Sequence, residues 1–571
     1  MKTYTYDCIV IGTGAAGYNA AIRLTEFGAN CAIVSEGINC GTSRNTGSDK
    51  QTYYKLGLSG DSPDSVHKMA QNLFDGGSVD GDNALCEAAR SARCFLNLCE
   101  LGVPFPVNRY GEYIGYKTDH DPFERATSAG PLTSKYMTEA LQKKAEDLDV
   151  KVFDGYRMVK LLKTDSRVCG LLCVCGEETV AFRCRDIIMA TGGPAGIYAD
   201  SVYPECHHGS TGLAIEAGAK MQNLALWQYG LASTKPRWNV SGTYMQVLPR
   251  FVSIDEKGNE HDFLWEHFTD KYEGLSLVFL KGYQWPFDHK KAEKGSSQID
   301  LLVYRECVEK GRKVFLDFTK NPYPIDFTML SNEAFEYLSK AGATFGTPIV
   351  RLQKMNSPAI ELNKTKGVDL YTEYLPIALC AQHNNGGIAV DMWWQTSVKG
   401  LFAVGECAGT HGIARPGGSA LNAGQVGSLR AAQYISEHPN ELVDEKLFYE
   451  LADKVEITFS DETAERMNAA RRRMSDNAAA VRDVEKIKAT LEITLAELKG
   501  TTDPFARDVL LTQGAVLTAM SQPNTDPQKV QEGQYINGAF TSSTRDVRPI
   551  PREDAFFENV WRGYRESKNI Y

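Results

Sequence analysis

Short apolar runs that end in glycine predict the buried strands of an α/β fold at the start of the chain. Residues 7–12 form such a run, and residues 15–27 follow with the apolar spacing of an amphipathic helix. A second apolar run covers residues 31–35. Together these segments have the length of one βαβ unit, about 30 residues, which predicts a parallel sheet of the dinucleotide-binding, Rossmann-like kind.

The pattern changes further along the chain, and each change predicts a domain boundary. Residues 1–233 and 372–440 carry glycine-punctuated strands and are assigned to one α/β domain in two parts. Residues 234–371 are rich in aromatic and charged side chains and lack those glycine turns, which predicts an inserted α+β domain. Residues 441–571 are helical and heavily charged, and they end in an extended tail from residue 522.

Length and composition are those of a multidomain globular protein. The 571 residues exceed what one core holds, and 43% hydrophobic with 23% charged residues argues against disorder. The net charge of −10 disfavours nucleic acid, which binds to basic faces. No segment reaches the roughly 18 apolar residues of a membrane span, and the folded pattern begins within the first residues, so a cytoplasmic protein is expected.

The 14 cysteines are scattered, with no C-x-x-C pair and no C-x-x-C-H haem motif. They are expected to be small buried residues rather than ligands of a metal or of an iron–sulfur cluster. His207 and His208 are adjacent, but no third ligand is spaced near them, so a structural role is favoured over metal binding. No metal site is predicted, and electrons for any redox reaction must come from outside the chain.

The turn after the first predicted strand carries a dinucleotide-binding motif, Gly12-x-Gly14-x-x-Gly17. The first glycine permits a tight turn, the second lets the backbone approach a pyrophosphate, and the third lets helix and strand pack closely. The helix begins at Ala15 and Ala16, where free N–H groups and the positive end of the helix dipole face the phosphates.

The residues that follow this unit favour FAD over NAD. Glu36 ends the second strand, where a carboxylate accepts hydrogen bonds from an adenosine ribose. An NAD domain would continue with further βα units, whereas residues 37–47 are small and suited to lie along an extended cofactor. Glu406 offers a second carboxylate for the ribityl chain, and no second G-x-G-x-x-G follows a strand. Further contacts to FAD are expected at Gly37, Ser43, Asn45, Thr46, Gly47, Met158, Ala190, Thr191, Gly192, Ala420 and Leu421.

Several motifs resemble those of the flavoprotein subunits of fumarate reductase and succinate dehydrogenase, a family that also includes L-aspartate oxidase and 3-ketosteroid dehydrogenases. They are the N-terminal glycine motif and the segments at 190–193, 227–229, 383–388 and 405–418. The resemblance implies an FAD-binding domain interrupted by a capping domain and followed by a helical domain, in agreement with the divisions above. It also implies hydride transfer between flavin N5 and a C=C or CH–CH unit next to a carbonyl or carboxylate.

Two substrate-binding positions of the family carry over to this chain. His383 and Arg415 match the histidine and arginine that hold the oxygens of the substrate. Hydride addition at a β-carbon pushes negative charge onto those oxygens, and fixed donors there stabilise the transition state. An arginine suits this role because it donates two hydrogen bonds in parallel.

Three departures from the family bear on the substrate and the cofactor. Gly230 stands in the place of a substrate-binding histidine, and by an ungapped count Ser297 stands in the place of the proton-delivering arginine. These losses speak against fumarate or succinate and imply a larger, less positive pocket. Asn45 stands in the place of the histidine to which covalent members attach FAD, so noncovalent FAD and reduction of the substrate are expected.

The proton donor and the reaction type leave alternatives open. Tyr244 matches a substrate-contacting position of the family and is the favoured donor, with Arg250, Tyr304 and Arg305 as other candidates. The preferred function is an FAD-dependent reductase with a small-molecule substrate and an external electron donor or acceptor, such as a redox protein. The alternatives are an oxidase or dehydrogenase of amines or hydroxy acids, and a flavin electron-transfer protein that needs a redox partner.

Overall fold

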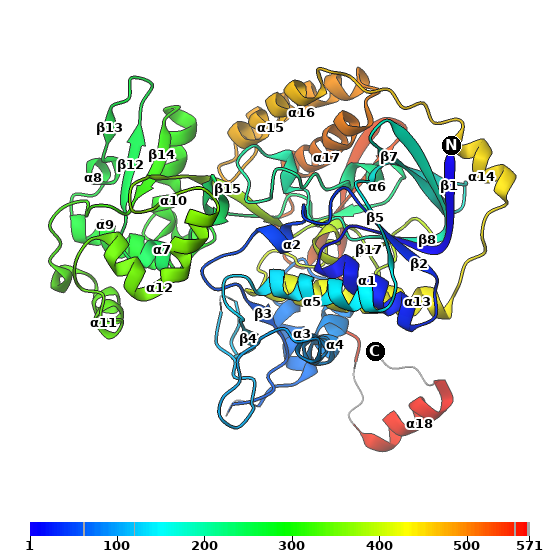
Figure 1. Ribbon diagram of the computed structural model, residues 1–571, viewed down its shortest axis with the longest axis horizontal. Coiled ribbons are helices and arrows are strands. Elements are labelled where there is room, and N and C mark those ends of the chain that lie inside the picture. The colour runs from blue at the N-terminus through cyan, green and yellow to red at the C-terminus, as the bar shows by residue number, and fades with distance from the viewer. Residues whose placement is uncertain (61–62, 119, 553–555, 568–571) are drawn as a thin grey trace.

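A seven-stranded sheet lies in the larger body of the molecule (Figure 1). The computed structural model describes residues 1–60, 63–118, 120–552 and 556–567. The strands, in spatial order, are β5 (Lys151–Asp154), β2 (Cys31–Ser35), β1 (Lys2–Ile11), β8 (Glu178–Met189), β7 (Val168–Cys175) and β6 (Arg157–Lys163), and β17 (Leu401–Ala403) also pairs with β8. Of these strands, β7 alone runs in the opposite direction to the other six.

The parallel strands end together and so gather the turns that follow them. Ile11 of β1 pairs with Met189 of β8, which in turn pairs with Ala403 of β17. Gly12 follows with a φ of +108°, and a Cβ added there would lie 2.5 Å from the carbonyl oxygen of Ala190. The predicted βαβ unit is therefore confirmed, although β1 begins at Lys2 rather than at residue 7.

The first helix of the α/β body packs against a helix that is distant from it along the chain. α1 (Ala15–Glu26) packs against α13 (Ser419–Glu437) and α5 (Thr133–Asp147). The amide of Asn19 donates to the carbonyl oxygen of Gln425 at 3.0 Å, and the Gln425 amide donates to that of Ala15 at 3.1 Å. These bonds join the two parts of the chain that were assigned to one α/β domain.

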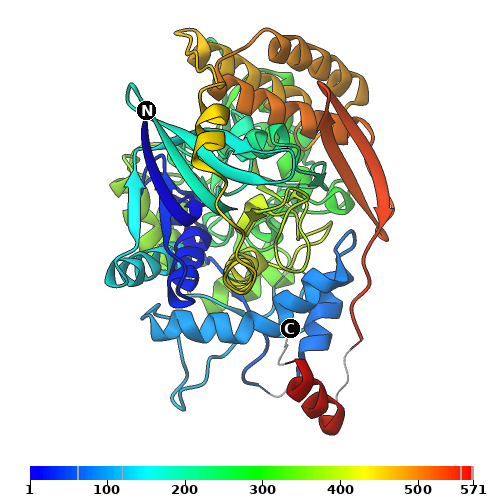
Figure 2. The same ribbon diagram turned by 90° about the vertical axis from the view of Figure 1, so that its right-hand side faces the viewer.

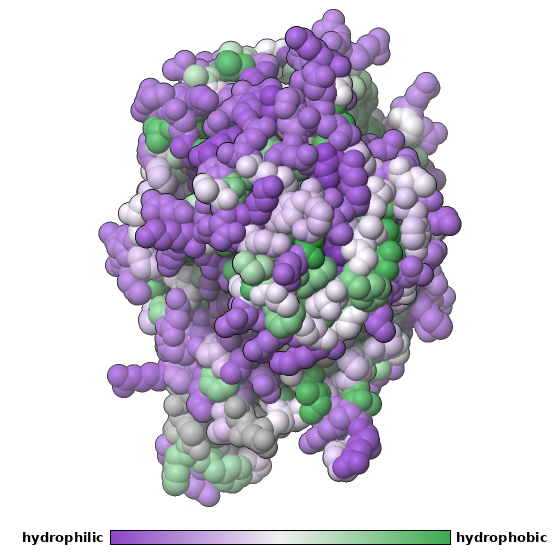
Figure 3. Space-filling model, turned by 90° about the vertical axis from the view of Figure 1, so that its left-hand side faces the viewer, coloured by the Kyte–Doolittle hydropathy of each residue, from purple (hydrophilic) through white to green (hydrophobic). Residues whose placement is uncertain are grey.

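A second sheet carries the chain into a capping lobe, at the left of Figure 1. The sheet is antiparallel in the order β11-β10-β15-β14-β12-β13. Its bounds are β11 (Arg237–Asn239), β10 (Trp227–Thr234), β15 (Leu375–Asn384), β14 (Lys313–Asp317), β12 (Arg250–Ile254) and β13 (Glu260–His261). Six helices complete the lobe: α7 (Thr243–Gln246), α8 (Phe263–His267), α9 (Lys271–Leu280), α10 (Ser297–Tyr304), α11 (Asn332–Lys340) and α12 (Pro348–Thr365). Hydrophilic side chains dominate the outer face of this end of the molecule (Figure 3).

The C-terminal part is helical as expected, but its tail differs from the prediction. α15 (Thr463–Asn477), α16 (Val484–Lys499) and α17 (Pro504–Ser521) pack on one another. The expected extended tail is wrong over residues 529–546, which form a hairpin along the side of the molecule in Figure 2. That hairpin, β18 (Lys529–Ile536) and β19 (Ala539–Asp546), joins β9 (Met221–Gln222) and β16 (Gly387–Ile388) in a four-stranded sheet.

A further helix, α18 (Phe557–Ser567), lies near the end of the chain and is set apart from the main body in Figures 1 and 2. Residues 553–555 and 568–571 of the predicted tail lie outside the described residues. Among the described helices, none combines the length and the apolar character that crossing a membrane requires.

Candidate functional site

One cavity of about 970 Å³ extends from the glycine turn after β1 to the capping lobe. Its lining comes from segments far apart in the chain that the two sheets bring together. The lining residues lie within the ranges 11–16, 34–52, 202–210, 225–228, 282–291, 404–406 and 413–425, together with single residues of other elements.

The glycine turn forms one end of this cavity. Gly12, Gly14, Ala15 and Ala16 line it, so the start of α1 lies at the cavity, where the Ala15 N–H donates to Ser43 Oγ at 3.4 Å. Gly17 does not line it, because a Cβ there would collide with the carbonyl oxygen of Gly12. Gly17 is thus a packing glycine, which is the role the motif predicts for its third glycine.

The carboxylate of Glu36 lies beside this turn and is paired on two sides. His208 Nδ1 is 2.6 Å from Glu36 Oε2, and Arg157 Nε is 3.3 Å from Glu36 Oε1. Burial acts to raise the pKa of Glu36, but the hydrogen bond with His208 and the charge of Arg157 outweigh it, so the pKa is lowered. The neighbouring His207 lies 3.0 Å from Thr42 Oγ1, and its burial lowers its pKa to about 4. The two histidines therefore tie residues 202–210 to the loop after β2.

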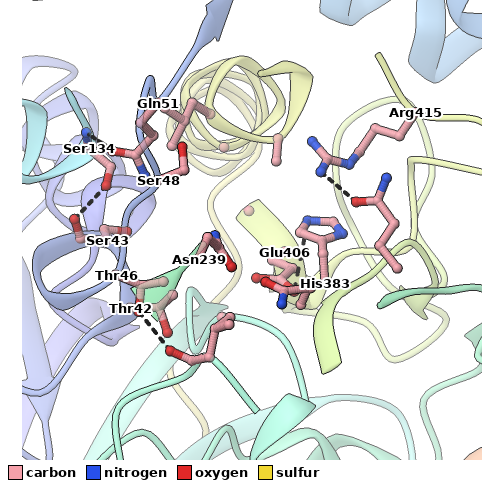
Figure 4. A pocket seen from close by; sticks show the side chains of 18 of the residues that line it. Thr42, Ser43, Thr46, Ser48, Gln51, Ser134, Asn239, His383, Glu406 and Arg415 are labelled. Carbon is pink, nitrogen blue, oxygen red and sulfur yellow. Dashed lines mark hydrogen bonds and ion pairs between the residues drawn. The ribbon is translucent and has the colours of Figure 1, made fainter. Parts of the chain in front are cut away.

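Small hydroxyl and amide side chains form one wall of the cavity, at the left of Figure 4. Ser134 Oγ donates to the carbonyl oxygen of Ser43 at 2.6 Å, and the Ser134 N–H donates to Gln51 Oε1 at 2.8 Å. Thr46 Oγ1 donates to the carbonyl oxygen of Val202 at 3.0 Å. These bonds hold the loop after β2, which includes the short helix α2 (Thr42–Asn45), against the cavity.

The opposite wall carries His383, Glu406 and Arg415 (Figure 4). Arg415 Nη2 donates to Gln228 Oε1 at 2.7 Å, and Gln228 pairs with His383 across β10 and β15. His383 Nδ1 lies 3.0 Å from Asn385 Oδ1. Within the described part of the chain, Arg415 Nε and His383 Nε2 are buried and have no hydrogen-bond partner. Such atoms are costly unless a bound molecule satisfies them.

Burial sets the charge states of this wall. It lowers the pKa of His383 well below the ordinary value, and the charge of Arg415 adds to the effect, so the imidazole is neutral. It also lowers the pKa of Arg415 to about 10, which leaves the guanidinium charged at neutral pH. Burial raises the pKa of Glu406 to about 7, although the Tyr203 hydroxyl and the Asn384 N–H both donate to its carboxylate.

Comparison with protein families decides which cofactor this cavity serves. Residues 7–272 and 308–421, more than half of the chain, match the family described as the FAD binding domain. The chain belongs to this family of flavoproteins. Residues 273–307, which include the cavity-lining residues 282–291 of the capping lobe, fall between the two matched segments.

Relatives of this flavoprotein are oxidoreductases. It is 26% identical over 450 residues to one subunit of the fumarate reductase (CoM/CoB) of Methanothermobacter marburgensis, covering 76% of this chain and 73% of that protein. It is 25% identical over 431 residues to L-aspartate oxidase of Mesorhizobium japonicum, covering 72% and 71%. The flavoprotein is therefore an FAD-dependent oxidoreductase, and the resemblance stated above is confirmed.

Solved structures share its fold over nearly the whole length. Sdh1 of Mycobacterium smegmatis, in complex with UQ1, superposes with a TM-score of 0.73 at 19% identity over 97% of this chain and 96% of that one. A quinol-fumarate reductase with menaquinol molecules also gives 0.73, at 18% identity over 97% and 100%. Adenylylsulfate reductase of Archaeoglobus fulgidus gives 0.63, at 15% identity over 97% of both chains. The expected architecture of FAD-binding, capping and helical domains is confirmed.

The cavity fits FAD by the chemistry of its lining. The start of α1 suits a pyrophosphate, and the carboxylate of Glu36 suits a ribose. The small lining residues of the loop after β2 leave room for a long cofactor. No group of three or more His, Cys, Asp or Glu side chains within the described ranges is arranged to hold a metal ion. The residues predicted to contact FAD that line the cavity are Gly12, Gly14, Ala15, Ala16, Glu36, Gly37, Ser43, Thr46, Gly47, Met158, Ala190, Thr191, Gly192, Glu406, Ala420 and Leu421.

Asn45, predicted as an FAD contact, does not line the cavity. Its side-chain amide donates to the carbonyl oxygens of Asn39 and Gly41, at 2.6 and 3.0 Å. Its own carbonyl oxygen accepts from Lys366 Nζ of the capping lobe at 3.2 Å. Asn45 therefore shapes the loop after β2 because its polar groups are used within the protein.

The predicted proton donor Tyr244 is also placed elsewhere. Tyr244 is 1% exposed, lies inside the capping lobe, and accepts a hydrogen bond from Asn363 Nδ2 at 3.0 Å. It does not line the cavity, and the same is true of Arg250, Tyr304 and Arg305. The assignment of Tyr244 as a catalytic residue is thus wrong, because the register of α7 directs this side chain into the packed interior.

The substrate end of the cavity is closed by a loop that the sequence did not single out. Residues 282–291 of the capping lobe line it, with Trp285 against β10. The expected enlargement beside Gly230 is wrong because the indole of Trp285 occupies that space. Lys290 and Lys291 line the same cavity, so positive charge is also present there. Its aromatic residues, Trp285 and Phe287, were the only feature of the sequence that could have indicated this loop.

Proposed function

We propose that this flavoprotein reduces a C=C bond next to a carbonyl or carboxylate, in a substrate other than fumarate, with FAD held noncovalently. The observation that carries the proposal is that Arg415 and His383 line the cavity that contains the FAD-binding turn. Among the described residues, Arg415 Nε and His383 Nε2 have no hydrogen-bond partner, and Nε2 lies 3.8 Å from Glu406 Oε1. Both atoms suit the oxygens of one carbonyl or carboxylate. Bound FAD supplies hydride transfer.

In this proposal Arg415 binds the substrate oxygens and stabilises the charge that develops on them. Gln228 fixes the guanidinium by accepting from Nη2, and both residues line the cavity. A charged donor held in place before reaction costs no reorganisation in the transition state, which is the main advantage of such sites. The surrounding side chains exclude water and thereby strengthen the interaction.

His383 binds the same oxygens and responds to their charge. Its imidazole is neutral in the free protein because burial and Arg415 both disfavour the cation. A carboxylate placed beside it favours the cation, and so raises its pKa. Binding of an anionic substrate therefore favours uptake of a proton at Nε2.

Trp285 determines what the far end of the substrate contacts. An indole at that end offers apolar surface and replaces the histidine that the resemblance predicts at position 230. We therefore expect a substrate with one activating carbonyl or carboxylate and an apolar or aromatic group beyond the double bond. Fumarate, with a carboxylate at each end, would place its second carboxylate against this indole, which favours a different substrate.

The decisive experiment is anaerobic. The purified protein is photoreduced and mixed with unsaturated acids and enones, and reoxidation of the flavin is followed by absorbance. Arg415→Ala is expected to slow reoxidation at least about a hundredfold and to leave the flavin spectrum unchanged. Lys143→Ala, at an exposed ion pair with Asp147, is the control. Normal reoxidation by Arg415→Ala contradicts the proposed substrate site.

The same measurements separate the alternative functions. Reoxidation by oxygen with release of peroxide, and no response to any enoate or enone, favours an oxidase. Turnover that requires a second protein favours an electron-transfer role within a larger complex, and the fumarate reductase relative is itself one component of such a complex by name. Turnover of the isolated chain with reduced viologen and an enoate supports the reductase.

The attachment of FAD has a separate test. Asn45 stands where the resemblance places the attachment histidine, and an amide forms no bond to the flavin. Denaturation in acid is therefore expected to release all flavin into the supernatant. Flavin that stays with the precipitated protein contradicts noncovalent binding.

A further inference from the structure

Residues 202–210 lie against the loop after β2 at the nucleotide end of the cavity. Beyond the two histidine contacts described above, a third contact joins them: the Cys206 thiol donates to the carbonyl oxygen of Cys40 at 3.5 Å. Both cysteines line the cavity. The two loops are separated by more than 160 residues of chain and meet only because the fold brings them together.

The two thiols differ in their surroundings. Of the 14 cysteines, all of them among the described residues, Cys206 alone is exposed. Cys40 is half-buried, with its sulfur packed over Gly37, where an added Cβ would lie 2.6 Å from Cys40 Sγ. Burial raises the pKa of the Cys40 thiol to about 12, and its hydrogen bond with the Cys206 side chain adds to the shift. The side chains are thus neighbours, and Cys206 is the one open to a reagent.

We propose that Cys40 and Cys206 form a reversible disulfide that fastens residues 202–210 over bound FAD. Adjacent thiols on separate loops, one of them exposed, are the arrangement that thiol–disulfide exchange requires. The other cysteines line strands and helices of the interior or lie partly buried on other elements. Reversible disulfides of this kind act as redox-sensing sites where the surroundings are reducing.

The oxidant is a low-molecular-weight disulfide. The Cys206 thiolate attacks one sulfur of the reagent, the reagent's S–S bond breaks, and one reagent thiol leaves. The Cys40 thiolate then attacks Cys206 Sγ, so the protein disulfide forms and the second reagent thiol leaves. Two electrons pass from the two cysteines to the reagent, and the two protons that the cysteines lose end on the two released thiols.

The disulfide would act on retention of the cofactor. His207, His208 and Cys206 lie on one segment, and Glu36, Cys40 and Thr42 lie on the loop beside which the nucleotide end of FAD is expected. A noncovalent cofactor leaves when such a segment lifts, and a covalent bond between the loops prevents that motion. This consequence rests on the proposed noncovalent binding of FAD, whereas formation of the disulfide does not.

Peptide mapping tests the bond itself. The FAD-loaded protein is treated with oxidised glutathione, alkylated, digested and analysed by mass spectrometry. The expected product is a Cys40–Cys206 peptide pair that dithiothreitol removes. Cys206→Ser is expected to abolish the pair, and Cys99→Ser, at a half-buried thiol of α4 (Gly81–Glu100), is expected to retain it. Only glutathione adducts, without the pair, would overturn the proposal.

Release of FAD tests the consequence. The rise in flavin fluorescence after dilution is expected to be at least about tenfold slower for the oxidised protein, because the disulfide opposes separation of the two loops. Dithiothreitol should restore the rate, and Cys206→Ser should be insensitive to oxidation. An unchanged rate in protein that carries the disulfide overturns the fastening role. If acid does not release the flavin, the noncovalent binding of FAD is refuted. That result does not affect the disulfide, which peptide mapping tests on its own.

Discussion

Gly230 lies directly beneath the indole of Trp285. A Cβ added to Gly230 would lie 2.7 Å from both Cε2 and Cζ2 of that ring. The indole Nε1 donates to the carbonyl oxygen of Leu231 at 3.1 Å, so the capping loop is hydrogen-bonded to β10 at this point. The absence of a side chain at position 230 is therefore what allows the loop to close the cavity.

Gly230→Ala is expected to push Trp285 away and to destabilise the protein by about 1–3 kcal/mol, the usual cost of overpacking a core. Thermal unfolding measures this loss, and reoxidation of the reduced flavin by substrate should slow with it. The double variant Gly230→Ala, Trp285→Ala removes the clash and should recover part of the stability. A single variant as stable and as active as the wild type would show that the two residues do not interact.

A buried ion pair supports the same loop. Lys281 Nζ lies 2.7 Å from Asp300 Oδ2, and both side chains are 0% exposed. The ammonium also donates to the carbonyl oxygens of Gln284 and Trp285, at 3.0 and 2.9 Å. Lys281→Met leaves Asp300 buried without its cation and is expected to cost about 3–5 kcal/mol.

Chemical denaturation and substrate titration measure that effect. Lys281→Met should lower the free energy of unfolding and raise KM, because the loop loses both of its carbonyl anchors. Lys281→Met with Asp300→Leu should recover most of the stability. Lys340→Met, at an exposed ion pair with Glu336, is the matched control and should change neither quantity. Equal effects of the two single variants would refute the anchoring role.

Gln228 is expected to act through Arg415. Gln228→Leu removes the acceptor at 2.7 Å from Arg415 Nη2, a hydrogen bond to a charged group. The loss is expected to lower kcat/KM about tenfold to a hundredfold, with FAD still bound. Gln433→Leu, an exposed glutamine of α13 hydrogen-bonded to Glu437, should have no effect. If Gln228→Leu behaves like this control, Arg415 does not depend on Gln228 for its position.

Binding of an anionic substrate is expected to weaken as the pH rises. The free pKa of His383 lies well below its ordinary value, and a carboxylate beside it raises that pKa. The bound state therefore binds the proton more tightly than the free state does, so affinity is highest below the free pKa and falls as the pH rises through the bound pKa. Calorimetry with an unreactive carboxylate in buffers of different ionisation enthalpy measures the proton uptake, which His383→Gln should abolish. Affinity that grows with pH would contradict this coupling.

Local elements of this protein were predictable from short stretches of sequence. The turn at Gly12, α1 and β2 follow from glycine positions and apolar spacing, which act over a few residues. Residues 529–546 were misread as an extended tail, because a hairpin of mostly polar strands depends on its pairing with β9. The side chain of Tyr244 was misplaced for a similar reason, since its direction depends on how α7 packs.

The amino-acid sequence by itself determined the cofactor and the class of oxidoreductase. The glycine turn with Glu36 and the motifs around His383 and Arg415 are each short stretches of sequence that can be recognised without the fold. Only the tertiary structure decided which residues from distant parts of the chain contact one another around the cavity. Trp285 covers Gly230 and Cys206 reaches Cys40 because distant segments are packed together by the two sheets. Such contacts depend on the closure of long loops, and no local pattern of residues encodes them.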